Sequence, residues 1–91
     1  MISRIHHVAI AVRDLERMVG IYADLLGLEC RVENMESYGI RMAMVTVGNG
    51  LVELIQPMHE TDPLGFHEFL EEKGEGLHHI AYEVEDIREA L

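Results

Sequence analysis

The sequence contains a single cysteine, Cys30, so it cannot form a disulfide within the chain. Charged residues and histidines also interrupt the first twenty positions, where a secretory signal needs an apolar segment. Both features predict a protein that works in a reducing compartment, and we expect the cytoplasm.

Basic residues are scarce, with seven Lys and Arg against seventeen Asp and Glu, which gives a net charge of −10. A field of that sign repels the phosphates of nucleic acid and the surface of an anionic membrane. The sequence also has no stretch near the roughly 18 consecutive apolar residues of a membrane span. We therefore expect neither nucleic acid nor a membrane as partner.

The chain nevertheless has the composition of one folded domain. Its 91 residues are 48% hydrophobic and 26% charged, which is ordinary for a globular protein and excludes the disordered classes. Periodicity predicts a strand over residues 4–12 and then a helix that Asp14 caps and Gly27 ends. Three more strands are expected, near 28–32, over 41–47 and over 51–55.

A second helix is predicted after this β-α-β-β-β order. Asp62 is the expected N-cap, and Pro63 then occupies the first helical position. Phe66, Phe69 and Leu70 give this helix an apolar edge, and a new strand begins after Gly76.

The new strand repeats the first one seventy-two residues later. Residues 6–15 and 78–87 share five identities, including both histidines of a pair, and two further positions are exchanges between aliphatic residues. Such a repeat predicts two copies of one structural unit. A complete second copy needs a helix and three strands after Asp86, so we expect the sequence to be cut short in its second unit.

Three side chains on one face of the predicted sheet have the chemistry of a metal site. His7 and His79 are equivalent in the repeat and have small neighbours on their face, such as Ala9 and Ala81. Glu53 shares its face with apolar residues, which a carboxylate tolerates only when it is paired or bound. Two imidazoles and a carboxylate suit a borderline divalent ion with open positions for a substrate.

Other interpretations of these residues stay open. A double histidine in a strand can be one surface residue and one hydrogen-bonded core residue, and Glu53 can be the solvent-facing residue of an edge strand. His6 and His78 are expected on the face opposite to the two candidate ligands, packed against helices or exposed. Cys30 is interpreted as an inert residue of the core.

Four segments resemble the vicinal oxygen chelate superfamily, which includes glyoxalases, bleomycin resistance proteins and dioxygenases, and within it the methylmalonyl-CoA epimerases. They are HVAIAV with Asp14 behind it, YADLLGL at 22–28, VELIQP at 52–57 and GEGLHHIAYEVEDI at 74–87. The resemblance implies an α+β fold of paired βαβββ modules, the glyoxalase-like fold, with the second module truncated. It divides the chain into a first module over 1–57, a linker helix over 58–75 and the start of a second module over 76–91.

The resemblance also implies a ligand set and a reaction. The metal ligands of the family fall on His7, Glu53 and His79, and the ion would be cobalt, manganese, nickel or zinc. The reaction would be the epimerisation of methylmalonyl-CoA through an enolate, with an acyl-CoA thioester as partner and a homodimer as the assembly. Catalytic bases remain unassigned, because the carboxylate that some epimerases carry in the third strand falls on Met42.

Two alternatives accompany this hypothesis. Glyoxalase I uses the same type of metal site on a glutathione hemithioacetal, so the candidate ligands alone do not separate a lactoylglutathione lyase from an epimerase. The chain can also be an inactive or binding half-module of the same fold, whose unpaired strand edges pair with another chain.

Overall fold

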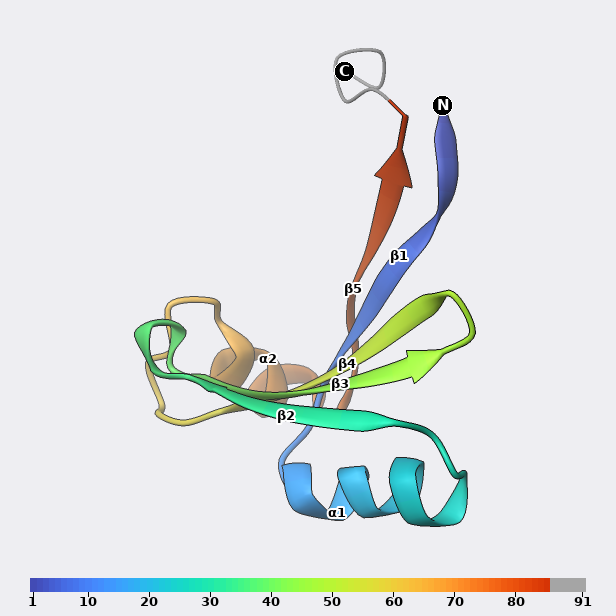
Figure 1. Ribbon diagram of the computed structural model, residues 1–91. Coiled ribbons are helices and arrows are strands. Elements are labelled where there is room, and N and C mark those ends of the chain that lie inside the picture. Colours follow the sequence, from blue (N-terminus) through green and yellow to red (C-terminus); the bar gives the residue numbers. More distant parts are fainter. Residues whose placement is uncertain (86–91) are drawn as a thin grey trace.

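The computed structural model describes residues 1–85 as a five-stranded mixed sheet with a helix on each face (Figure 1). Its elements are β1 (Ile2–Ala11), α1 (Leu15–Gly20), η1 (Ile21–Leu25), β2 (Cys30–Met35), η2 (Glu36–Tyr38), β3 (Ile40–Val47), β4 (Gly50–Pro57), α2 (Phe66–Lys73) and β5 (Gly76–Val84). The expected start of a second helix at Asp86 and the remainder of the proposed second module lie outside the described residues.

The strands lie in the order β2-β3-β4-β1-β5. Strands β1 and β4 pair in parallel, and all other neighbours are antiparallel. The sheet with its helices confirms the α+β class, and the described residues form a single short module. The division at residues 57 and 75 stays a prediction.

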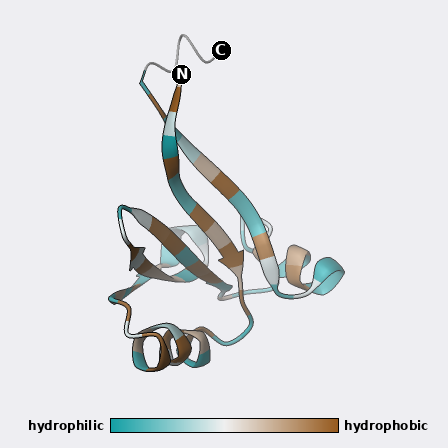
Figure 2. Ribbon diagram, turned by 90° about the vertical axis from the view of Figure 1, so that its right-hand side faces the viewer, coloured by the Kyte–Doolittle hydropathy of each residue, from teal (hydrophilic) through white to brown (hydrophobic). Residues whose placement is uncertain are grey.

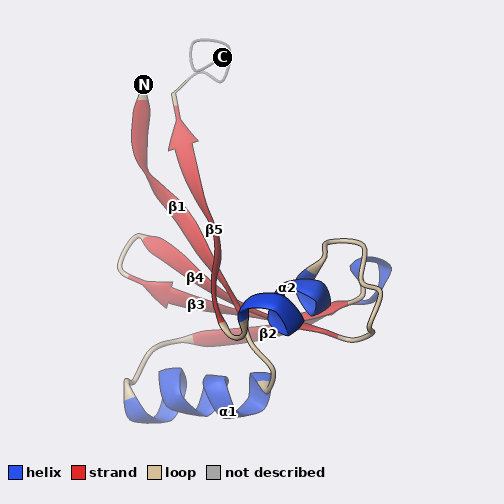
Figure 3. Cartoon of the chain, turned by 180° about the vertical axis from the view of Figure 1, so that it is seen from behind, coloured by secondary structure: helices blue, strands red, loops and turns tan. Residues whose placement is uncertain are grey.

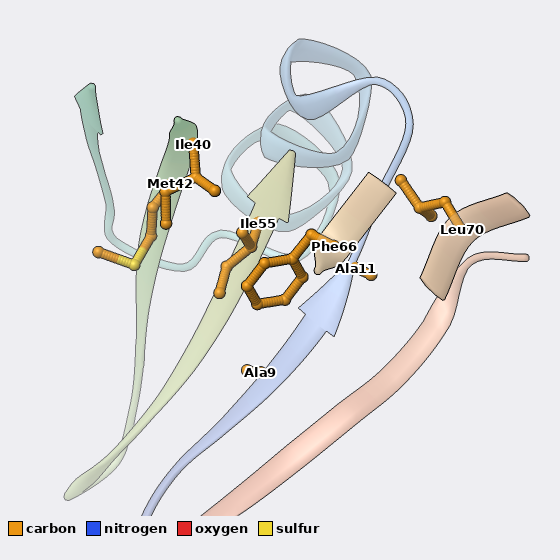
Figure 4. Packing of buried hydrophobic residues seen from close by; sticks show 7 residues of the cluster. All are labelled: Ala9, Ala11, Ile40, Met42, Ile55, Phe66 and Leu70. Carbon is orange, nitrogen blue, oxygen red and sulfur yellow. The ribbon is translucent and has the colours of Figure 1, made fainter. Parts of the chain in front are cut away.

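Alternating side chains give the sheet two apolar faces. On the face of α1, Leu15 packs with Val12, which follows β1, and with residues of β3 and β4, namely Ala43, Val45 and Leu54. On the face of α2, Phe66 and Leu70 pack with Ala9, Ala11, Ile40, Met42 and Ile55. Figure 4 shows the Phe66 ring beside Ile55. Neighbouring residues of one strand thus belong to the apolar clusters on opposite faces, because successive side chains of a strand point to opposite sides of the sheet.

Strands β1 and β5 form a long antiparallel ribbon that extends beyond the other strands (Figure 3). Along it, polar and apolar residues alternate in bands (Figure 2). The pairs His7↔Ala81 and Ala9↔His79 lie on either side of the pair Val8↔Ile80. Because His7 and His79 are equivalent in the repeat, these pairs are related by a local two-fold axis through Val8↔Ile80.

The register of the ribbon shifts at three places, one of them between Ile2 and Arg4, and the other two are equivalent in the repeat. The two equivalent shifts lie between Ile5 and His7, and between Ala9 and Ile10, where β5 continues from His79 to Leu77. The ladder therefore skips His6 in β1 and His78 in β5. Such β-bulges change the direction of local side chains.

Both helices begin close to the predicted positions, with one correction. Asp14 caps α1 by accepting a hydrogen bond from the Arg17 N–H, and the helix continues as the π-helix η1. Helix α2 begins at Phe66 and not at Pro63, with Gly65 in the left-handed conformation at its N-cap. The prediction was wrong because residues 62–65 form a turn, closed by the Gly65 N–H on the Asp62 carbonyl.

Asp62 still satisfies the first turn of α2. Its buried carboxylate accepts hydrogen bonds from the Phe66 N–H at 2.8 Å and the His67 N–H at 2.7 Å. Free N–H groups at a helix start are costly when they are left unpaired. Asp62 thus holds the helix end from which Phe66 enters the core.

No helix within residues 1–85 has the length and apolar character needed to span a membrane.

Replacing Asp62 with alanine should lower the free energy of unfolding by about 1 to 2 kcal/mol, because two helix N–H groups lose their acceptor. Urea denaturation followed by circular dichroism measures the change. Glu60→Ala, at an exposed position of the same connection, should change the free energy by less than about 0.5 kcal/mol. Equal effects of the two substitutions would show that Asp62 has no capping role.

Candidate functional site

The three predicted ligands come from three adjacent strands. Ala9 of β1 pairs with Glu53 of β4 on one side and with His79 of β5 on the other. The side chains of Ala9, Glu53 and His79 therefore form one row across the sheet, and His7 lies two residues along β1 on the same face. Ala9 is fully buried, and its small side chain leaves room for the larger ones around it.

The side chains of these residues approach one another at the centre of that row. His7 Nε2 lies 3.2 Å from His79 Nε2 and 3.7 Å from Glu53 Oε1. The side chains of His7 and Glu53 are 18% and 17% exposed, so both are largely shielded yet reachable. His7 is thus the member of the set that lies near both others.

The two bulges add a second pair of imidazoles. His6 Nδ1 lies 2.8 Å from His7 Nδ1, and His78 Nδ1 lies 3.0 Å from His79 Nδ1. Simple alternation predicted His6 and His78 on the opposite face, away from the candidate ligands. That prediction was wrong for both, because the ladder skips them and the bulges turn each toward its neighbour. Four imidazoles consequently form a continuous series.

The two outer histidines differ in their surroundings. His6 is exposed, whereas His78 packs against α2, with ring centroids 4.3 Å from Phe66 and 4.9 Å from Phe69. This burial lowers the pKa of His78 below its ordinary value, and the neighbouring His79 lowers it further. His78 is therefore favoured as a neutral imidazole.

A cavity of about 370 Å³ lies next to this series and is mainly apolar. Its polar and titratable wall groups are Tyr38, Glu53, His78 and His79, and the rest of the lining consists of Met35, Ile40, Met42, Ile55, Leu64 and Phe66. Small-molecule sites usually combine such an apolar lining with a few polar groups. Sequence reasoning did not anticipate Tyr38 and Leu64, since they reach the cavity from separate connections.

The donor types fit a divalent ion, and the spacing of the two imidazole nitrogens fits one as well. Two nitrogens that bind one ion at about 2.1 Å, at angles near 90° to 110°, lie about 3.0 to 3.4 Å apart, which includes the 3.2 Å between His7 and His79. Within residues 1–85 no three such side chains already form a closed cluster. An ion there would therefore require Glu53, whose Oε1 lies 3.7 Å from His7 Nε2, to move toward the two imidazoles.

The remaining candidate residues lie apart from this series. Cys30 is half-buried, and burial raises the pKa of its thiol, which agrees with an inert core residue. His67 pairs with Glu71 on α2 at 3.7 Å. Met42 lines the cavity. It occupies the position in the third strand at which the resemblance implies a carboxylate in some epimerases.

Comparison with known proteins identifies the family. Residues 6–91 match the model of the glyoxalase/bleomycin resistance protein/dioxygenase superfamily. The chain belongs to this superfamily.

Several relatives of the chain are epimerases. The chain is 43% identical over 89 residues to the ethylmalonyl-CoA/methylmalonyl-CoA epimerase of Cereibacter sphaeroides, covering 96% of this chain and 65% of that protein. It is 35% identical to the mitochondrial methylmalonyl-CoA epimerase of Mus musculus, covering 99% of this chain and 51% of that protein. The chain thus spans half to two thirds of the length of these relatives.

A solved structure shows the same fold. A variant of Streptomyces coelicolor methylmalonyl-CoA epimerase in complex with 2-nitronate-propionyl-CoA superposes with a TM-score of 0.83 at 31% identity, covering 99% of this chain and 66% of that one. The resemblance stated from the sequence is therefore confirmed, both for the superfamily and for its epimerases.

In the metal-free protein we expect His78 to titrate below the ordinary histidine value of 6.5. NMR titration of the ring resonances measures this pKa. Replacing Phe69 with alanine exposes His78 and should raise its pKa, because burial is the largest cause of the shift.

The lowered pKa of His78 makes stability depend on pH. The unfolded chain takes up a proton on His78 at a higher pH than the folded chain, so the free energy of unfolding falls as the pH drops below 6.5. A pKa of His78 at or above the ordinary value in both proteins would contradict the assigned burial.

Proposed function

We propose that this protein is a metal-dependent epimerase that interconverts the stereoisomers of methylmalonyl-CoA. The observation that carries the proposal is the approach of two imidazole nitrogens and a carboxylate beside an apolar cavity. The choice of reaction is supported by the relatives of the chain, several of which are epimerases.

His7, Glu53 and His79 would hold the ion in this proposal. A divalent ion bound there supplies Lewis-acid stabilisation of the negative charge that develops when the proton beside a thioester carbonyl is removed. Glu53 adds a negative charge to two neutral imidazoles, which favours a divalent cation over a monovalent one. Its position beside His7 favours the role of ligand over that of base.

The cavity would receive the acyl part of the substrate. Ile40, Met42 and Ile55 lie on its floor, within the α2-face core. Such walls exclude water from the reacting carbon, which strengthens every charge interaction at the site. Glu53 is the one carboxylate on the wall that residues 1–85 provide, and as a proposed metal ligand it leaves no other carboxylate of these residues on the wall to act as a base.

The proposal includes a homodimer in the cytoplasm. Strand β5 is an edge of the described sheet, and Leu77, Ile80 and Tyr82 on it are exposed. Exposed apolar side chains on an edge strand favour pairing of its outer edge with a second copy of the chain.

Metal binding is the first expected outcome. After metal has been removed with a chelator, the protein should bind one Co²⁺ or Zn²⁺ per chain in a calorimetric titration. Replacing His79 with alanine should weaken binding at least about a hundredfold, since one of three proposed protein ligands is lost. His67→Ala removes a histidine outside the site and should leave binding unchanged; equal loss in both variants would overturn the ligand assignment.

Exchange of the substrate's C2 proton is the second expected outcome. In deuterated buffer the metal-loaded protein should introduce deuterium at C2 of methylmalonyl-CoA, detected by mass spectrometry. Exchange should fall at least about a hundredfold in Glu53→Ala and with the ion removed. Absence of exchange with metal demonstrably bound would refute the epimerase, and turnover of the hemithioacetal of glutathione and methylglyoxal would favour the lyase instead.

A further inference from the structure

Two hollows flank Glu53 on the α2 face of the sheet. Strand β3 pairs Met44 with Glu53 and Met42 with Ile55, so Met42 lies diagonally across from Glu53, within reach of a long side chain. The cavity described above lies on the Met42 side. A second hollow of about 250 Å³ lies on the Met44 side and is lined by Glu29, Arg31, Met44, Thr46 and Leu51. A substrate held beside Glu53 therefore has a different wall on each side.

The walls of the two hollows differ in chemistry. Hydrocarbon and thioether groups form most of the first wall, whereas Glu29, Arg31 and Thr46 contribute charged and hydroxyl groups to the second. An alkyl group gains about fourfold in binding for each methylene that it transfers from water to an apolar wall. The alkyl substituent at C2 of the substrate therefore belongs in the first cavity.

The first cavity is larger than a methyl substituent requires. A methyl group is close in size to a water molecule, which occupies about 30 Å³ in the liquid, whereas the cavity has a volume of about 370 Å³. The malonyl group takes part of this space, and room remains for further methylenes. The cavity thus admits an alkyl substituent of several carbons.

Met42 is the adjustable part of the buried wall of this cavity. Ile40, Ile55 and Phe66 are at most 3% exposed and pack in the core, so they keep their positions. Met42 is also buried, but its unbranched side chain has three rotatable bonds. Figure 4 shows the end of this side chain pointing away from Phe66. Rotation of that end changes the room in the cavity without moving the sheet.

We propose that Met42 is a specificity-determining residue, through which the site accepts malonyl thioesters with unbranched 2-alkyl groups of three or four carbons. The thioether end turns aside for a longer group and fills the space beside a methyl group. This inference rests on the proposed function, because it concerns the substrate of the same site. It adds the class of acyl group and the residue that selects it.

The ratio of two substrates tests the accepted acyl group. Deuterium exchange at C2 gives kcat/KM of the metal-loaded protein for propylmalonyl-CoA and for methylmalonyl-CoA, and the two values should agree within about tenfold. A pocket fitted to methyl alone would lose more than this, since each added methylene costs about tenfold or more where no room exists. A loss above tenfold would therefore overturn the proposed substrate range.

Substitutions of Met42 test its role in opposite directions. Met42→Phe places a stiff ring in the cavity and should lower the ratio of propylmalonyl-CoA to methylmalonyl-CoA at least about tenfold. Met42→Ala enlarges the cavity and should raise the ratio of butylmalonyl-CoA to methylmalonyl-CoA about 3- to 10-fold. Both ratios are measured within one preparation, so they do not depend on the fraction of folded protein.

Met44→Phe is the matched control, because Met44 lies on the same strand and the same face but lines the second hollow. Its ratio of propylmalonyl-CoA to methylmalonyl-CoA should stay within about threefold of the unsubstituted protein. Unchanged ratios in both Met42 variants, or an equal shift in Met44→Phe, would refute the role of Met42 while exchange of methylmalonyl-CoA still supports the epimerase. Absence of exchange with every thioester would refute the proposed function, and this inference with it.

Discussion

The pairing of β1 with β5 is the constraint on which the candidate site depends. It joins strands that lie far apart in sequence, and its centre at Val8↔Ile80 makes the two halves of the repeat face each other. His7 and His79 then occupy diagonal positions across an antiparallel ladder, where long side chains are within reach. A slip of one residue would send one of them to the other face.

The remaining elements support this ribbon from one side. Parallel pairing of β1 with β4 adds Glu53 to the row that contains Ala9 and His79. Helix α2 covers the same face with Phe66 and Leu70, and Asp62 holds the start of that helix. The polar site is thus built on a rigid apolar base, which keeps its donor atoms in place without filling the cavity beside them.

Much of the fold could be predicted from the sequence because local rules act over a few residues. Alternation located the strands, Asp14 marked the start of α1, and the repeat identified His7 and His79 as equivalent. The start of α2 was misplaced, since a turn over residues 62–65 uses the same residue types as a helix cap. His6 and His78 were placed on the wrong face because a bulge arises from pairing between strands, which a single strand's pattern does not contain.

The sequence by itself therefore determined the residue types of the site, its repeat and the superfamily, since these depend on local pattern and composition. Only the tertiary structure decided which atoms meet: the 3.2 Å between the two inner histidines, the carboxylate beside His7 and the two bulged imidazoles. It also separated His78 from His6, because α2 covers one half of the repeat and leaves the other exposed. The physical reason is that a repeat makes two segments alike, whereas packing against a third element makes them different.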